Sequence, residues 1–518
     1  MTEENRNPEP LIVNLKYFIL LFFMMAWVGL FPSVLIAYWY FMAFPFSVDP
    51  LYLVLLIPVF LGLYGIALLS SLAATKLGIW LVYKRISRPI PGSYPLTMEN
   101  PHVRAFILKG NIKNFGRWLF YFPHWDFLRA IWLRQMGIKI GKKVKLGHHI
   151  LDDDFLEFGD NSFLARETGF SGHLMDHTHL TLHPTKIGKN CILKWVSGAV
   201  GGIMGDYSIL ETATAVMKGQ ICRGNAIYKG VPCKKVGNYS DLTAEDIEKM
   251  KKEIRSFDKI NYTKMKNAVI KISNVKLFLM KIVVVFTGCI LGLIFPFLYG
   301  LLVNISFLSS NTFLNIFLIM LIPFIFIASI GFFVVGTILC IKLFLMYYDK
   351  KVEIPEGTYE LDDPRAKIFK IKYFLRLFGL RIFHGTPFKI ADTMAMKVWG
   401  NVKIGKTTKL EDAYVDPQYL EIGDYCQIAL AVRIHTHDIV DGKLYIKKVK
   451  LGNNVIIGPY VHIKPGVEVA DGSVLGIAAW LRKNLKTKHP ALWIGKPAFE
   501  LPLSFLTKSA HLEGKYID

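Results

Sequence analysis

Charged residues are missing from long stretches of this 518-residue chain. Tyr17–Val48 and Pro50–Thr75 contain no Asp, Glu, Lys or Arg, and neither does Ile282–Ile341, which the polar residues 309–312 divide in two. A helix needs about 20 apolar residues to cross the hydrocarbon core of a bilayer, so each of the four stretches is long enough. The missing charge excludes a purely soluble protein and predicts four membrane-spanning helices in two hairpins. We place these hairpins at residues 12–83 and 275–347.

Acidic residues are also scarce, with 40 Asp and Glu against 62 Lys and Arg and a net charge of +22. Basic residues gather where the apolar stretches meet the polar regions 84–276 and 348–518, whereas the predicted outer loops hold only Asp49. By the positive-inside rule, we expect a multi-pass protein of the cell membrane with both polar regions in the cytoplasm. The first apolar stretch is expected to be an anchor, because no short apolar core with a cleavage site precedes it. The positive charge suits anionic lipid or phosphate-bearing substrates, and we expect no nucleic-acid partner.

Cysteine is rare as well. The six cysteines show no C-x-x-C spacing, and two of them lie within the apolar stretches. This usage excludes a disulfide framework and predicts free thiols in a reducing compartment.

The sequence repeats itself once. LEFGD at 156–160 recurs as LEIGD at 420–424, and IGKN at 187–190 recurs as LGNN at 451–454. From residue 156 onward the offset between matching positions stays at 264 or 265. Self-similarity at a fixed spacing is the signature of repeated structural units. We therefore expect a tandem duplication, in which a membrane hairpin followed by a polar domain occurs twice.

Aromatic and basic segments at 114–136 and 367–383 separate each hairpin from its polar domain. The aromatic spacing of the first segment suits an amphipathic helix that lies at the membrane interface. A helix that packs beneath its own domain is the alternative. Between the two units, Thr243 and Asp246 form a capping box that opens a predicted connector helix at 243–270.

A six-residue pattern recurs through the polar regions: an aliphatic residue, a Gly or small residue, two polar residues, and a small or branched residue. It reads IGKKVK at 140–145 and IGKNCI at 187–192 in the first unit, and LGNNVI at 451–456 in the second. An aliphatic residue at every sixth position stacks inside a prism, while Gly, Asp or Asn suits the tight corners. Three such hexads make one coil of a parallel β-helix. The pattern predicts β-helix domains at 137–238 and 385–503.

These hexads resemble the left-handed β-helix, or hexapeptide-repeat, acyltransferases. The likeness covers residues 137–237 and 385–500, and the ending PGVEVADGSVLGIAAWLRKN…WIGKPA at 465–498 is similar to that of sugar and capsule O-acetyltransferases. The alternation of membrane hairpins with such domains also resembles the carboxy-terminal membrane region of polylysine-synthetase-type nonribosomal peptide synthetases. In that region, three tandem domains join aminoacyl units delivered as thioesters, whereas this sequence has two.

The resemblance implies a membrane protein of two transmembrane α-helical hairpins, each followed by a left-handed parallel β-helix domain. It also implies an acyltransferase that moves an acyl group from acyl-coenzyme A or an acyl-carrier thioester to a hydroxyl or amine of a small molecule or envelope precursor. No permanently bound cofactor is expected. The alternatives are amide formation between carrier-delivered amino acids, and a non-catalytic scaffold in an envelope assembly or transport complex. Such β-helices usually form trimers, so we expect an oligomer.

The stretch IHTHDIVDG at 434–442 carries the predicted catalytic residue. In the resembling family a loop histidine, commonly followed by Asp, is the general base, and this role falls on His437 with Asp438 beside it. Imidazole suits the role because its pKa lies near neutral pH. His435 shares a strand face with His437 and is expected, with Asp438, to contact substrate. A His-x-His zinc site is the alternative, but no third ligand with clear spacing is present in this region, and we expect no metal.

The first unit offers a second histidine. The offset of 264 places His173 opposite His437 without a gap, which predicts a second general base. A competing alignment sets residues 177–179 against 435–437, and a degenerate domain kept for assembly is the alternative for the whole unit.

The last coil is expected to hold the acyl donor, as the resemblance implies. Backbone groups there would contact the pantetheine arm, and basic side chains would lie near its phosphates. The residues are Gly476, Ala478 and Ala479 for the arm, and Arg482, Lys483 and the first-unit counterpart Lys218 for the phosphates.

Overall fold

The computed structural model describes most of the chain. The described residues are 15–44, 49–123, 125–146, 149–150, 154–165, 168–175, 179–257, 270, 272–309, 312–388, 390–400, 403–405, 408–410, 413–429 and 432–503.

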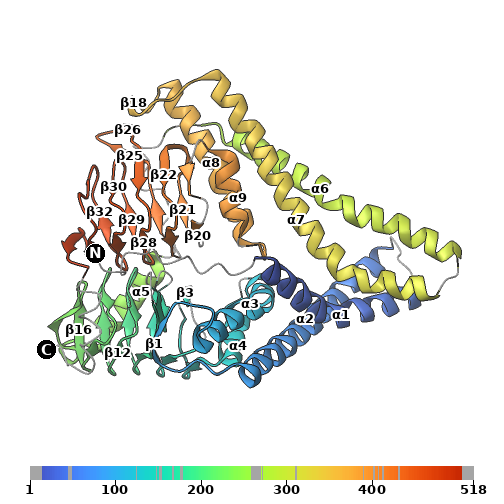
Figure 1. Cartoon of the computed structure of the whole chain (residues 1–518), viewed down its shortest axis with the longest axis horizontal. Helices are drawn as coiled ribbons and strands as arrows, with labels where there is room; N and C mark the ends of the chain where they lie inside the picture. The colour runs from blue at the N-terminus through green and yellow to red at the C-terminus, as the bar shows by residue number, and fades with distance from the viewer. Residues whose placement is uncertain are drawn as a thin grey trace.

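Four of the described helices are long and apolar enough to cross a membrane. They are α1 (Leu15–Ala43), α2 (Pro50–Arg85), α6 (Asn274–Ser309) and α7 (Thr312–Lys351). The helices pack in two pairs, α1 with α2 and α6 with α7. The two pairs converge at one end of the molecule and separate toward the polar regions (Figure 1). The pairs also meet where α1 lies against α7, and there Trp27 Nε1 donates to the Met320 carbonyl at 2.9 Å. The six cysteines of the chain are free thiols.

The hexads of the first polar region form coils with three parallel sheets. Their strands are β2 (Lys139–Ile140), β3 (His149–Ile150), β4 (Leu156–Phe158), β5 (Phe163–Leu164), β6 (Gly169–Ser171), β9 (Thr185–Ile187), β10 (Ile192–Leu193), β11 (Gly198–Val200), β12 (Ile203–Met204), β13 (Ser208–Leu210), β14 (Ala215–Val216), β15 (Ile221–Cys222), β16 (Ala226–Lys229) and β17 (Lys234–Gly237). The sheets run β2-β4-β9-β12-β15, β3-β6-β11-β14 and β5-β10-β13-β16, and β17 turns back antiparallel to β16.

The second polar region forms three parallel sheets in the same way, and its last strand, β34, turns back antiparallel to β33. Their strands are β19 (Lys403–Ile404), β20 (Lys409–Leu410), β21 (Tyr414–Val415), β22 (Leu420–Ile422), β23 (Gln427–Ile428), β24 (Arg433–Ile434), β27 (Val449–Leu451), β28 (Ile456–Ile457), β29 (His462–Ile463), β30 (Glu468–Val469), β31 (Val474–Leu475), β32 (Trp480–Leu481), β33 (Leu492–Ile494) and β34 (Phe499–Leu501). Ile456 pairs with Val474, which pairs with Leu492, so these two coils repeat after 18 residues and contain the three hexads that the sequence predicts.

The Gly and Asx residues of the hexads have separate functions. Asn454 takes the left-handed corner conformation with φ 54°, as predicted. Gly452 is needed for a different reason, because a Cβ there would collide with Asp471 of the next coil. The Asp471 carboxylate in turn accepts a hydrogen bond from the Asn453 backbone N–H at 2.8 Å. Each coil is therefore tied to the next at its corner.

Two helices precede each β-helix. They are α3 (Pro101–Tyr121) and α4 (Asp126–Met136) in the first half, and α8 (Pro364–His384) and α9 (Ile390–Trp399) in the second. The buried indoles of Trp132 and Trp399 belong to the two main apolar cores, which continue into the coils. The outer side of α4 leaves Trp125 and Ile131 exposed. One side of this helix thus packs on the apolar core, and the interfacial position of its exposed side stays a prediction.

Two of the predicted boundaries are wrong. The segment 114–136 is not one helix, because Pro123 lacks the N–H that would continue α3 and the chain starts a new helix at Asp126. The start of the predicted domain 385–503 is also helical, since residues 391, 395, 396 and 399 form a buried stripe on α9 before the first strand at Lys403.

The remaining elements connect and cover the coils. These are η2 (Tyr239–Asp241), α5 (Ala244–Phe257) and η4 (Pro417–Tyr419). The capping box at the start of α5 is present, because Asp246 N–H donates to Thr243 Oγ1 at 3.1 Å. Ile254 of α5 packs on Ile192 and Ile209 of the first β-helix. The predicted connector continues to residue 270, but 258–269 lie outside the described part of the chain.

The two β-helices contact each other through apolar corners, side by side in Figure 1. Tyr460, Ile477 and Ala478 of the second β-helix pack with Ala215 of the first. Gly169 lies under the Tyr460 ring, where a Cβ would collide with it. A single chain therefore brings its two β-helices together.

Candidate functional site

A β-hairpin leaves the coils of each half and carries a histidine. In the second half, β25 (His437–Val440) and β26 (Lys443–Ile446) form the hairpin, and β26 also pairs with β18 (Gly357–Glu360), which directly precedes α8. In the first half, β7 (His173–Met175) and β8 (His179–Leu182) pair in the same way with β1 (Gly92–Pro95). Each hairpin is thus held between the coils and the helical layer.

His437 is held by a buried carboxylate. Its Nδ1 lies 2.9 Å from Asp416 Oδ2, and the Asp416 side chain is 1% exposed. Asp416 stands next to the histidine strand because its backbone N–H donates to the Ile434 carbonyl at 3.1 Å. With Nδ1–H donating to the carboxylate, the lone pair of the neutral ring is on Nε2.

Asp416 is kept ionised by its surroundings. Burial alone would raise its pKa, but the hydrogen bond from His437 and the charges of His437 and Arg376 lower it to about 2. The buried Arg376 guanidinium lies 4.0 Å from Asp416 Oδ1 and donates to Gln418 Oε1 at 3.1 Å. A permanently charged carboxylate fixes the tautomer of His437 and stabilises its protonated form.

Aromatic rings of α8 flank the imidazole. The ring centroids of Phe369 and Tyr373 each lie 4.8 Å from that of His437, in edge-on geometry. The His437 side chain is 18% exposed. The imidazole is therefore fixed on two sides and retains a solvent-accessible part.

His435 lies next to His437 in a different environment. The two ring centroids are 6.3 Å apart and the rings are nearly perpendicular. Burial, followed by the neighbouring charges of His437 and Lys464, lowers the pKa of His435 to about 4. His435 is thus neutral near pH 7. Among the described residues no group of three His, Cys, Asp or Glu side chains is arranged to hold a metal ion.

Asp438 does not orient His437, although it is the next residue. Its carboxylate faces the coils, with Lys464 Nζ at 3.3 Å and Lys483 Nζ at 3.9 Å. These ion pairs tie the hairpin to the last coils. They also bring Lys483, a predicted donor contact, beside the histidine hairpin.

The backbone N–H groups at the predicted donor contacts of the last coil are already hydrogen-bonded. The N–H groups of Gly476, Ala478 and Ala479 all donate within the chain, to Trp493, Pro459 and Gly476 respectively. Backbone contacts of these residues to a pantetheine arm stay a prediction, and carbonyl oxygens rather than N–H groups would make them. The side chains of Ala478 and Ala479 are buried, whereas those of Arg482 and Lys483 are exposed.

The first half reproduces part of this geometry. His173 pairs with Leu182 as His437 pairs with Ile446, which agrees with the gapless alignment. The ring centroids of His173 and of Phe106 on α3 lie 5.1 Å apart. The Nδ1 atom of His173 lies 3.1 Å from Ser171 Oγ. Lys218 Nζ donates to Thr181 Oγ1 at 3.4 Å. Residues 177 and 178 of the competing alignment lie outside the described residues.

Asp416, Arg376 and Phe369 were not predicted from the sequence. A usable signal existed for Asp416, because Asp152 precedes it by the same offset of 264 that relates the two histidines. Asp152 itself lies outside the described residues. Arg376 and Phe369 lie on a helix that the sequence places before the coils, and nothing local marks their approach to His437.

Comparisons with known proteins find one family-model match, and it lies in the second β-helix. Residues 448–476 match the family model of the bacterial transferase hexapeptide (six repeats). The chain thus carries the repeat of the hexapeptide transferases in the coils next to His437.

Two characterised proteins are similar to parts of this chain. The chain is 23% identical to delta-poly-L-ornithine synthetase of Acinetobacter baumannii (strain AB307-0294) over 402 residues, which cover 72% of this chain and 27% of that protein. It is 34% identical to galactoside O-acetyltransferase of Escherichia coli (strain K12) over 94 residues, which cover 16% of this chain and 46% of that protein. This chain thus spans less than half of the length of either relative.

A solved structure is similar as well. The maltose O-acetyltransferase of Clostridium difficile 630 aligns with 20% identity and a TM-score of 0.23, over 28% of this chain and 92% of that one.

Proposed function

We propose that this chain is a membrane-anchored acyltransferase in which His437 is the general base. The observation that carries the proposal is the 2.9 Å hydrogen bond between His437 Nδ1 and the buried carboxylate of Asp416. A base that a second side chain orients suits acyl transfer from a thioester. The likeness to galactoside O-acetyltransferase supports the same reaction class.

In the proposed reaction, Nε2 of His437 takes the proton of an acceptor hydroxyl or amine. The acceptor oxygen or nitrogen forms a bond to the thioester carbonyl carbon, and the carbonyl becomes an oxyanion. The tetrahedral intermediate collapses as the carbon–sulfur bond breaks, and the imidazolium gives its proton to the leaving thiolate. The products are an ester or amide and a free thiol. Asp416 stabilises the imidazolium while the intermediate exists.

The donor in this proposal is acyl-coenzyme A or an acyl-carrier protein. Lys483 and Arg482 supply exposed positive charge beside the histidine hairpin, and Lys483 Nζ lies 3.9 Å from Asp438. A pantetheine arm along the last coil would be held by carbonyl oxygens and side chains, because the N–H groups there are used within the chain.

We further propose that the two helix pairs cross the cell membrane as hairpins and that both β-helices face the cytoplasm. Basic residues at 84–85 and 350–351, at the ends of α2 and α7, support this orientation. The matching sheet orders β1-β8-β7 and β18-β26-β25 support an origin by duplication. With two β-helices per chain, a trimeric set of β-helices would need a third from another copy.

A second candidate is amide formation between amino acids delivered by a carrier protein. Its support is the likeness to delta-poly-L-ornithine synthetase, which extends over 72% of this chain and so includes more than the coils. Both candidates use the same base. They differ in the acceptor, which would be an amine in the second case.

Incubation of the full chain with thioester donors and a panel of hydroxyl and amine acceptors tests the proposal. Free thiol is measured as it appears. We expect acceptor-dependent thiol release that His437→Ala together with His173→Ala abolishes, with an aminoacyl donor and an amine acceptor favoured if the second candidate holds. Equal release by the wild type and this double variant would reject the histidines as bases, and no acceptor-dependent release above the buffer background would support the scaffold alternative.

A further inference from the structure

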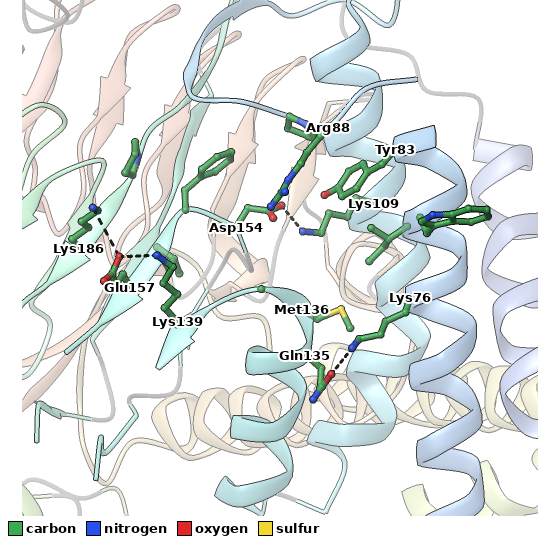
Figure 2. Close-up of a pocket in the computed structure, with 17 residues that line it drawn as sticks. Lys76, Tyr83, Arg88, Lys109, Gln135, Met136, Lys139, Asp154, Glu157 and Lys186 are labelled. Atoms are coloured by element: carbon green, nitrogen blue, oxygen red, sulfur yellow. Dashed lines mark hydrogen bonds and ion pairs between the residues drawn. The ribbon is translucent and has the colours of Figure 1, made fainter. Parts of the chain in front are cut away.

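A cavity of about 560 Å³ lies between the membrane helices and the first β-helix, away from the histidine hairpin of the second half. One wall comes from α2 and α3, another from the end of α4, and the third from β2, β4 and β9. Figure 2 shows Lys76, Arg88 and Lys109 on the helical side and Lys139, Glu157 and Lys186 on the strand side.

The cavity is strongly basic. Five of its lining residues are Lys or Arg and two are acidic, so positive charge is in excess. Asp154 is paired with the buried Lys109, and the other carboxylate, Glu157, lies between Lys139 at 3.7 Å and Lys186 at 3.9 Å. Lys76 and Arg88 are exposed and face the same space. A ligand with at least one negative charge fits this arrangement.

The position of the cavity along α2 indicates a lipid. Lys76 is the first charged residue after the uncharged run Pro50–Thr75. That run has 26 residues. At about 1.5 Å of rise per residue it exceeds the roughly 30 Å hydrocarbon core, so Lys76 stands at headgroup level when α2 crosses the bilayer. Ile79 and Trp80 add an apolar rim beside the charges, and Trp80 is exposed. Charge next to an apolar rim suits a headgroup with its acyl chains.

Lys76 has a counterpart in the second half, and Arg88 has none. A Cβ at Gly116 would meet Thr75 and a Cβ at Gly379 would meet Ile341, so Thr75 corresponds to Ile341 and Lys76 to Lys342. Residues 352–356, which precede β18, include no Lys or Arg. Arg88 is thus the charge that distinguishes the first-half cavity.

We infer that this cavity binds the anionic, phosphate-bearing headgroup of a membrane lipid. The phosphate lies between Lys76 and Arg88, and the acyl chains leave along the Trp80 side of α2. Lys109, which lines the cavity, is one helical turn from Phe106, whose ring contacts His173. A bound lipid would therefore anchor the first half next to its own histidine. The inference depends on α2 crossing the membrane and not on acyl transfer.

Lipid binding by the full chain in mild detergent tests the inference, measured by native mass spectrometry without any acyl donor. The probes are phosphatidylglycerol, phosphatidylcholine and inorganic phosphate. We expect phosphatidylglycerol to bind about tenfold more tightly than phosphatidylcholine, and Lys76→Gln with Arg88→Gln to weaken it by about tenfold. The matched control is Lys350→Gln with Lys351→Gln, at the end of α7, which should change the affinity by less than about twofold.

Three results would overturn the inference. Equal weakening by both double variants would mean general attraction to the basic surface. Equal affinity for the two lipids would mean that the negative charge of the headgroup does not contribute to binding. Displacement of phosphatidylglycerol by inorganic phosphate at a similar concentration would identify a soluble anion as the ligand. Both substituted side chains are exposed, so the variants are expected to fold, and unchanged thermal unfolding checks this.

Discussion

The imidazole of His437 and the carboxylate of Asp416 lie 2.9 Å apart, although 21 residues separate them in the chain. The contact exists because Asp416 directly follows β21, and β21 pairs with β24, the strand that leads into the histidine hairpin. The nearer carboxylate, Asp438, is instead paired with lysines of the last coils. The two acidic residues therefore have different consequences for the reaction.

Asp416→Asn should lower kcat strongly. The amide cannot stabilise the imidazolium and can hold the wrong tautomer of His437, so we expect a loss of about 10²- to 10⁴-fold. The rate of thiol release at saturating donor measures it, in a His173→Gln background so that only the second half is active. Glu360→Gln is the control and should leave kcat within about threefold, because its ion pair with Lys443 lies at the exposed surface. Equal losses in the two variants would contradict the assignment of Asp416.

His173→Gln should lower thioester turnover through the first half alone. If the two halves act independently, the single variant loses up to about half of the total rate, and the addition of His437→Gln removes the rest. Total thiol release from the single and double variants measures this. A His437→Gln variant that is already at background, with no further loss from His173→Gln, would show that the first half is an assembly domain.

Acid should destabilise the second β-helix before any carboxylate titrates. Burial lowers the pKa of His435 to about 4 and that of His462 to about 3. Between those values and about 6.5, the unfolded chain binds the protons more readily. The free energy of unfolding is therefore full above about pH 6.5 and falls as the pH drops below it.

Thermal unfolding of the full chain between pH 7 and pH 5 measures this effect. The double variant His435→Gln with His462→Gln should show a smaller fall of the apparent Tm than the wild type. His489→Gln is the control, because that side chain is 64% exposed. An unchanged pH dependence in the double variant would mean that other groups control acid stability.

Gly452→Ala should destabilise the second β-helix. The added Cβ would collide with Asp471, and overpacking of this kind costs about 1–3 kcal/mol. Gly110→Ala is the matched control on α3, where a Cβ meets open space and Ala is the better helix former, so a gain of about 0.5–1 kcal/mol is expected. The apparent Tm of each variant checks both. Equal behaviour of the two variants would be inconsistent with close coil stacking.

Features repeated at short range could be predicted from the sequence. The hexads specify their own coils, since each aliphatic residue meets its counterpart one coil away, as Ile456 meets Val474. The apolar stretches likewise specify their own helices, because the hydrogen bonds of a helix join residues that are four positions apart in the chain. The offset of 264 also placed His173 in the register that it occupies.

Features that depend on packing between distant elements could not be predicted. Phe369 and Arg376 approach His437 and Asp416 only because α8 lies across the hairpin. The start of α9 was hidden because a short apolar segment does not distinguish a helix from a strand. The hydrogen bonds of the N–H groups in the last coil also depend on the register between coils, which the residues 476–479 alone do not specify.

The most direct test of His437 as the base is the rate of thiol release by the full chain with His437→Gln in a His173→Gln background, at saturating thioester and acceptor. A glutamine keeps polarity at this position but cannot accept the acceptor proton. Relative to His173→Gln alone, we expect a loss of about 10²- to 10⁴-fold in kcat with donor affinity unchanged. A double variant that keeps the kcat of His173→Gln would contradict this role, because the base that Asp416 orients would then play no part in the reaction.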